Sequence, residues 1–174
     1  TTRQARRDEF LDAMNIASAC SVMLGHRNGY SFEDDEFVSV ACDVFSILDS
    51  LGPSLEKIVT HDAGLYGGDY AHSLHELVRD AVFQAASWGE GMTDKLHVFA
   101  RADKKMSSDL LLQKLDLLKP YIDGTQRAAV DERINDVIPF EGTVHISARS
   151  IRFIRNVSHA LCSTQWNGHT LTSF

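Results

Sequence analysis

Two similar stretches decide the fold that this sequence predicts. They are ACSVMLGHRNGYSFEDDEFV at residues 19–38 and LHVFARADKKMSSDLL at residues 96–111. Each reads as an apolar helix, a polar turn, a serine that caps the next helix, an acid soon after it, and a second apolar helix. This pattern is typical of a helical hairpin, and its repetition predicts an all-α fold.

Apolar residues recur at helical spacing along most of the chain, with glycine or proline between the runs. The expected helices cover, in chain order, residues 8–25, 31–51, 53–60, 69–88, 93–102, 107–118 (before Pro120) and 125–138. Residues 143–161 are ambiguous, because Val144, Ile146 and Ala148 alternate like a strand whereas the later apolar residues follow a helical face. We favour a helix from Ser147. The sequence therefore predicts an all-α single-domain bundle of about seven helices over residues 1–162, followed by an extended C-terminal tail over 163–174.

The composition fits one globular domain. The chain has 174 residues, a mass of 19.4 kDa and 44% hydrophobic residues, which is enough to build a core. Its net charge of −7 argues against a nucleic-acid partner, because neutralising phosphates requires a concentrated basic face. The apolar runs are too short to predict a membrane span. We therefore expect a protein partner and no membrane.

Charge is unevenly distributed along the chain. Residues 28–56 contain seven acids and no Lys or Arg, whereas residues 142–174 contain three arginines and no acid. These opposite faces can pair within one molecule or between copies, which predicts a self-associating homo-oligomer. The candidate partner-binding residues are Glu33, Asp34, Asp35, Glu36, Arg149, Arg152 and Arg155. The four acids also suit the first turn of a helix, where they complement its dipole.

Three cysteines bear on the compartment. Cys20, Cys42 and Cys162 show no CxxC spacing, and free cysteines in apolar helical positions behave as small hydrophobic residues. A reducing cytoplasm is the expected location. The alternative is one disulfide with one free thiol.

The duplicated joint resembles the TerB-like family of tellurite-resistance proteins, which also occurs as a domain in some co-chaperones. In that family a helix runs into Asp-Gly, and a serine and an acid open the next helix, twice in an all-helical bundle. The resemblance covers about residues 8–120. Here the joints read Asn28-Gly29 and Asp103-Lys104, so neither keeps Asp-Gly, and a cation site does not carry over.

A second resemblance concerns metal chemistry. His26, His61-Asp62 and Asp103 follow one another in the order seen in HD-domain metal-dependent phosphohydrolases, which are also all-helical. The resemblance implies a divalent transition metal held by these four residues, whose bound water attacks a phosphoester. A separate group, Asp69, His72, His75 and Glu76, has the spacing of one helix face, and a solvated helix start is the favoured interpretation of it.

No motif for acyl transfer, P-loop hydrolysis or dinucleotide binding occurs in the chain. We therefore expect a non-enzymatic helical interaction or regulatory module, connected with stress response through the TerB-like resemblance, with no cofactor and no catalytic residue assigned. Two alternatives stay open. One is the HD-type phosphohydrolase with its metal, and the other is a helical structural subunit of a virus or filament.

Overall fold

The chain divides into two compact units. The computed structural model describes residues 3–26, 34–62, 73–102, 104–135 and 138–146. Unit 1 comprises Thr1–Met23 and Ala102–Glu141, and unit 2 comprises Leu24–Arg101 and Gly142–Phe174. The single domain expected over residues 1–162 spans both units, and the expected tail lies outside the described residues.

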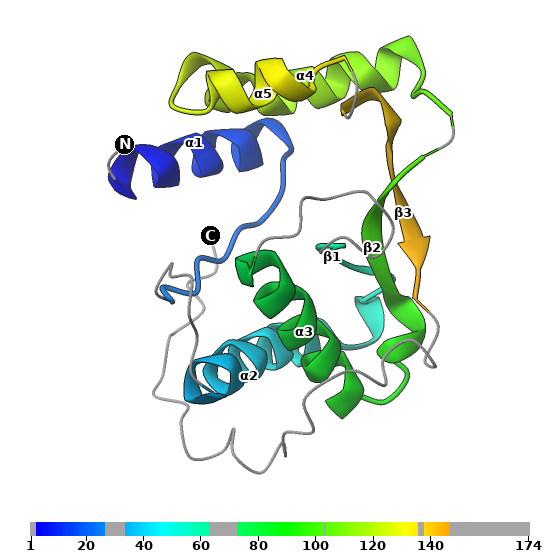
Figure 1. The fold of residues 1–174 in the computed structure, drawn as a ribbon. Helices are drawn as coiled ribbons and strands as arrows, with labels where there is room; N and C mark the ends of the chain where they lie inside the picture. Colours follow the sequence, from blue (N-terminus) through cyan, green and yellow to red (C-terminus); the bar gives the residue numbers. More distant parts are fainter. Residues whose placement is uncertain (1–2, 27–33, 63–72, 103, 136–137, 147–174) are drawn as a thin grey trace. The chain divides into compact units, whose positions relative to one another are not determined.

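Unit 1 is helical. It consists of α1 (Arg3–Ile16), α4 (Ser108–Asp123), α5 (Arg127–Arg133) and the short 3-10 helix η3 (Ile138–Phe140). Helix α1 packs along α4, which also packs against α5 (Figure 1). The Ser107 hydroxyl caps α4 by accepting a hydrogen bond from Leu110 N at 3.3 Å, whereas the sequence left Ser107 and Ser108 open as the cap. Lys114 on α4 holds η3 by donating to Ile138 O at 3.2 Å and by pairing with Glu141.

Two helix ends in unit 1 differ from the prediction. Helix α1 ends at Ile16 instead of residue 25, because Ser18 takes a left-handed conformation with φ of 51°, which closes the helix. Val22, which contributed to the apparent continuation of the helical pattern, is 47% exposed. Helix α4 continues through Pro120 to Asp123 instead of stopping before the proline.

Unit 2 is a layer of two helices on a small sheet. Helices α2 (Asp34–Leu51) and α3 (Ser73–Trp88) lie side by side (Figure 1). The sheet has the order β1 (Ile58–Thr60), β2 (Leu96–Arg101) and β3 (Glu141–His145), and the 3-10 helices η1 (Gly52–Ser54) and η2 (Thr93–Lys95) precede β1 and β2. Strand β1 runs parallel to β2 with Ile58 opposite Leu96, so β1, α3 and β2 form a βαβ unit.

Strand β3 runs antiparallel to β2. Ile146 N donates to Leu96 O at 2.9 Å, and Ala102 N donates to Phe140 O near the other end of the ladder. This register places His97 opposite His145, and their rings are in contact with centroids 5.3 Å apart.

The core of unit 2 lies between the helices and one face of the sheet. Residues of β2 alternate, so Leu96, Val98 and Ala100 are buried while Phe99 is 44% exposed. The main cluster contains Leu48, Leu55, Ile58, Val82, Phe83, Ala85, Ala86, Met92, Leu96, Val98 and Ile146. A second cluster packs α2 on α3 and contains Phe37, Val38, Val40, Ala41, Cys42 and Ala81.

The prediction of an all-α bundle of about seven helices is wrong. The described residues form five α-helices and a three-stranded sheet. The expected helix over 53–60 is η1 followed by β1, and the helix expected over 93–102 is η2 followed by β2. Both strands are short apolar runs. They are strands because they pair with each other, although they lie far apart in the sequence. Residues 141–145 form β3, and the helix favoured from Ser147 lies outside the described residues.

The stretch Glu36–Ser54, most of which is α2, has the length and the mean hydropathy, 1.2, of a membrane span. This is weak evidence for a span, because the core helix of a globular protein has the same composition. In this structure 33% of the stretch is buried, including Phe37, Val40 and Ala41, which belong to the cluster that packs α2 on α3.

The cysteines differ in state. Cys42 is buried and disulfide-bonded, whereas Cys20 is exposed and free. This corresponds to the alternative of one disulfide and one free thiol. The expectation of a reducing compartment rested on unpaired cysteines, so it loses that support.

Thiol titration tests the state of Cys42. We expect the denatured protein to give one reactive thiol per chain before reduction and three after it, since the chain has three cysteines. A Cys20→Ser variant should give none before reduction. Three thiols in the unreduced protein would contradict the bond at Cys42.

Candidate docking groove

Unit 1 carries an open groove between α1 and the C-terminal end of α4. Its volume is about 780 Å³, and the residues that line it are Ala5, Asp8, Glu9, Asp12, Asn15, Ile16, Pro120, Asp123, Gly124 and Thr125. All the charged residues among them are acidic. The uncharged lining includes the apolar side chains Ala5, Ile16 and Pro120, and Ile16 is 48% exposed. The groove therefore combines apolar contact area with negative charge.

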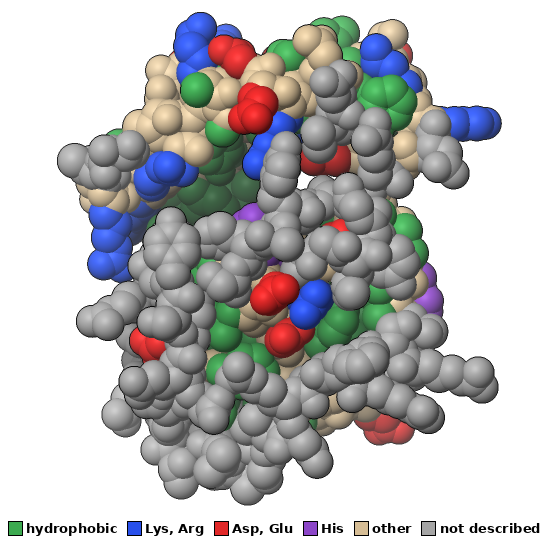
Figure 2. Space-filling view, viewed as in Figure 1, with side chains coloured by type: hydrophobic (Ala, Val, Ile, Leu, Met, Phe, Trp, Pro, Cys, Tyr) green, Lys and Arg blue, Asp and Glu red, His purple; other side chains and the backbone are tan. Residues whose placement is uncertain are grey.

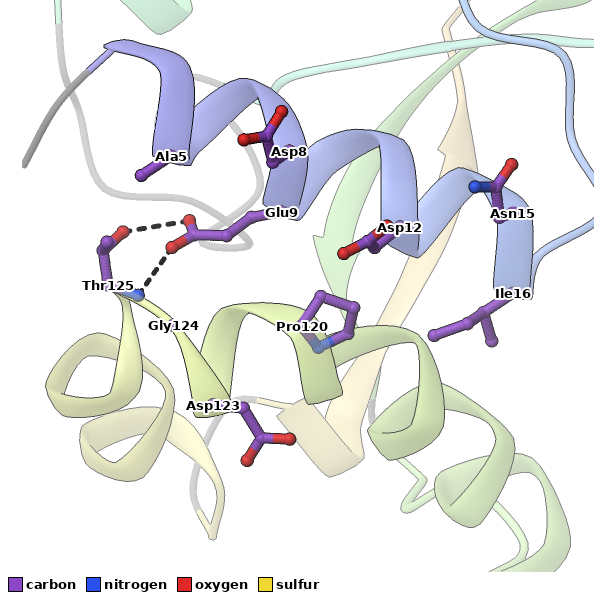
Figure 3. Close-up of a pocket in the computed structure, with 10 residues that line it drawn as sticks. All are labelled: Ala5, Asp8, Glu9, Asp12, Asn15, Ile16, Pro120, Asp123, Gly124 and Thr125. Atoms are coloured by element: carbon purple, nitrogen blue, oxygen red, sulfur yellow. Dashed lines mark hydrogen bonds between the residues drawn. The ribbon is translucent and has the colours of Figure 1, made fainter.

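One buried carboxylate fixes the end of the groove. Glu9 on α1 is only 7% exposed, and it accepts hydrogen bonds from Thr125 N at 2.6 Å and from Thr125 Oγ1 at 2.9 Å (Figure 3). The backbone N–H of Thr125 follows the last turn of α4, so this carboxylate ties α1 to the end of α4. Hydrogen bonds to an ionised acceptor are among the stronger ones in proteins, and burial strengthens them further.

Gly124 makes this contact possible. A Cβ atom at this position would collide with the Glu9 carboxylate and would lie 2.8 Å from Pro120 O. Gly124 N donates to Pro120 O at 3.0 Å and ends α4. The glycine is thus required by the close approach of the backbone to Glu9, and not by its φ of −98°.

The other acids lie along the rim. Figure 3 shows Asp12 and Ile16 facing Pro120 across the groove, with Asp8 on the α1 side and Asp123 on the α4 side. Asp8 and Asp12 are one helical turn apart and both are exposed. Lys and Arg side chains also lie on unit 1 (Figure 2), but none is among the residues that line the groove.

The groove also affects a neighbouring tyrosine. Burial, and secondly the negative charge of Glu9, raise the pKa of Tyr121 above its ordinary value. This phenol therefore reports on the charge at Glu9.

The three described residues of the predicted metal site, His26, His61 and Asp62, do not form one cluster. His26 Nε2 lies 2.8 Å from Asp43 Oδ2, His61 stacks on His75 with ring centroids 4.3 Å apart, and Asp62 is fully buried. Asp103 lies outside the described residues. Parallel stacked imidazoles direct their nitrogen lone pairs side by side, not towards a common ion. Among the residues that the structure describes, no group of three or more His, Cys, Asp or Glu could hold a metal.

The other candidates are only partly described. Of the second cluster, His75 and Glu76 lie on α3, while Asp69 and His72 lie outside the described residues. Of the predicted partner-binding acids, Asp34 and Asp35 begin α2 and Glu36 is half-buried. Glu33 and the arginines Arg149, Arg152 and Arg155 lie outside the described residues.

The sequence interpretation missed the groove. Its two walls are 116 positions apart at the Glu9–Thr125 contact, and no local pattern indicates which helices pack together. The available signals were the acids at 8 and 12 on one helix face and the Gly-Thr pair after the expected helix end.

Comparison of the chain with protein-family models, with curated proteins and with solved structures finds no match. The TerB-like and HD-domain resemblances therefore stay predictions from the sequence. The sheet in unit 2 departs from the all-helical fold that both of them imply.

Proposed function

We propose that this protein is a non-enzymatic interaction module that self-associates, and that the groove on unit 1 receives the basic segment of a second copy. The observation that carries the proposal is the groove itself, in which every charged lining residue is acidic and apolar surface lies beside the acids. A segment that fits must therefore carry both cationic and apolar side chains.

The chain contains such a segment. Residues 147–161 read SARSIRFIRNVSHAL, with Arg149, Arg152 and Arg155 three positions apart, several apolar residues and no acid. Arginine forms bidentate contacts with carboxylates, and opposite charges speed association and select the partner. This charge complementarity supports a second copy as the occupant.

A peptide of residues 147–161 tests the groove directly. We expect the labelled peptide to bind the full chain, and the double variant Asp8→Asn, Asp12→Asn to weaken binding about tenfold at low salt, since each exposed ion pair contributes up to about 1 kcal/mol. Fluorescence anisotropy measures the dissociation constants. The matched control is Asp131→Asn, which removes an exposed acid of α5 that does not line the groove.

Two further results decide the proposal. A peptide with glutamine in place of the three arginines should bind at least tenfold more weakly, and sedimentation should show association that weakens as salt rises. Equal binding by both peptides would reject the acidic groove as the docking site. A monomer at low and at high salt would reject self-association.

A further inference from the structure

The face of the sheet in unit 2 that points away from the helices carries two neighbouring histidines. His97 on β2 and His145 on β3 are cross-strand partners, and their rings meet edge to face with centroids 5.3 Å apart and an interplanar angle of 71°. Partners of this kind are the closest side chains on a sheet, so like charges on both destabilise the pairing of the strands.

A third cationic group lies beside the pair. Lys57, which precedes β1, donates from Nζ to Thr143 Oγ1 on β3 at 2.6 Å, and so reaches across β2 on the same face. Neither charged residue of η2 forms an ion pair with an imidazole in the described structure, so the side chain of Asp94 does not neutralise the pair and Lys95 is itself a cation. Lys95 Nζ donates to Leu55 O, and Asp94 contributes only its backbone carbonyl, 2.9 Å from His145 Nε2. Glu141, at the other end of β3, pairs with Lys114.

The environment of His97 disfavours a proton. Its Nδ1 is buried and has no hydrogen-bond partner among the residues that the structure describes. Burial, then the positive charge of Lys57, then His145 lower the pKa of His97 below its ordinary value. Neutral His97 is therefore the form that fits the closed sheet.

Besides its pairing with β2, the distal end of β3 is held by Ile146 and by side-chain hydrogen bonds of His145 and Thr143. Ile146 is 1% exposed in the main core cluster, and its N–H donates to Leu96 O at 2.9 Å. Thr143, Val144 and His145, which precede it, are all exposed. Strand β3 is at the edge of the sheet, so it can separate from β2 while β1 stays paired with β2, once the hydrogen bond from Lys57 to Thr143 is broken.

We propose that the His97–His145 pair is an acid-sensitive latch that holds the end of β3 against β2 at neutral pH and releases it in mild acid. When β3 separates, His97 becomes solvated and moves away from His145. The open state then takes up a proton more readily than the closed state. As the pH falls below about 6.5, linkage raises the equilibrium constant for opening by up to about tenfold per pH unit. This rise ends when the pH reaches the lowered pKa of His97 in the closed state.

Amide hydrogen exchange at Ile146 tests the latch. Protection factors, corrected for the intrinsic pH dependence of exchange, are compared at about pH 7.5 and about pH 5.5. We expect the wild-type protection of Ile146 N–H to fall in acid by up to about tenfold, the limit for uptake of one proton over this range. In His97→Gln the fall should be absent, because glutamine takes up no proton. Lys57→Met and His145→Gln should each reduce the fall, and Lys57→Met should reduce it more, because burial and then Lys57 lower the pKa of His97 more than His145 does.

Two controls keep the result specific. His26→Gln, which alters a histidine paired with Asp43, should respond to acid like the wild type. The core amides of α2 should stay protected at both pH values. Equal protection of wild-type Ile146 at both pH values, an undiminished fall in His97→Gln, or a parallel loss of protection throughout α2 would each overturn the latch.

Discussion

Replacing Phe37 by alanine is expected to lower the free energy of unfolding of unit 2 by about 3–5 kcal/mol. Phe37 is 1% exposed and belongs to the cluster that packs α2 on α3. Truncation removes the transfer free energy of a whole aromatic ring and leaves a cavity that Val40 and Ala81, held on two helices, cannot fill. Because α2 also flanks the main core, its loosening should reach the sheet.

Urea unfolding followed by circular dichroism measures this loss. The matched control is Phe99→Ala, which removes the same side chain from the exposed face of β2, where Phe99 is 44% exposed, and should cost less than about 1 kcal/mol. Two transitions, one for each unit, would still allow the test, because only the transition of unit 2 should move. Equal losses in the two variants would contradict the placement of Phe37 in the core.

The helix that carries Phe37 was predicted closely, and the reason is physical. Helix α2 has 18 residues with a continuous apolar face, and its end at Leu51 is followed by Gly52-Pro53. Over such a length the helical period is distinct and the termination signals are local. The same holds for α3 and for the start of α4 after Ser107.

The strands could not be predicted in this way. Strand β1 has three residues and β2 has six, which is too short for a period of two to be separated from a helical pattern. Their conformation depends on the pairing of Ile58 with Leu96, 38 positions away. Residues 104–107 lie between two elements, as expected of the second joint, but the first of these elements is a strand and not a helix.

The candidate site depended on the same kind of distant contact. The prediction favoured residues with distinctive chemistry, such as His26 and His61, which the structure engages with Asp43 and His75 instead. The groove is built from common acids on α1 and α4, and it exists only because these two helices pack together. A sequence shows which side chains are acidic, but not which of them share a concave surface.

Removing the Glu9 carboxylate should have the second-largest effect. Glu9→Ala is expected to lower the free energy of unfolding of unit 1 by about 2–4 kcal/mol, because it abolishes two charge-assisted hydrogen bonds and leaves Thr125 N–H without its acceptor. Thermal unfolding measures the loss. The control Asp8→Ala removes an exposed acid from the same helix and should change the free energy by about 0.5 kcal/mol or less.

Tyr121 gives a second readout, to be taken where the variant is still folded, because unfolding would itself lower this pKa by removing the burial. In Glu9→Gln the negative charge that opposes the phenolate is gone while burial remains, so the pKa of Tyr121 should fall part of the way to its ordinary value. The ultraviolet absorbance of the phenolate, taken as the difference from a Tyr121→Phe background, follows this titration. An unchanged pKa would show that Glu9 does not lie near this ring.

A double-mutant cycle between Glu9→Gln and Thr125→Val then separates the contact from the burial of each side chain. Glutamine keeps one oxygen that can accept from Thr125 N, whereas valine removes the hydroxyl and keeps the shape of the side chain. We expect a coupling free energy of about 1 kcal/mol, because the hydroxyl donates to the ionised carboxylate at 2.9 Å. If the two losses are simply additive, the Thr125 hydroxyl does not stabilise this end of the groove through Glu9, and only the backbone N–H of Thr125 remains as a partner of the carboxylate.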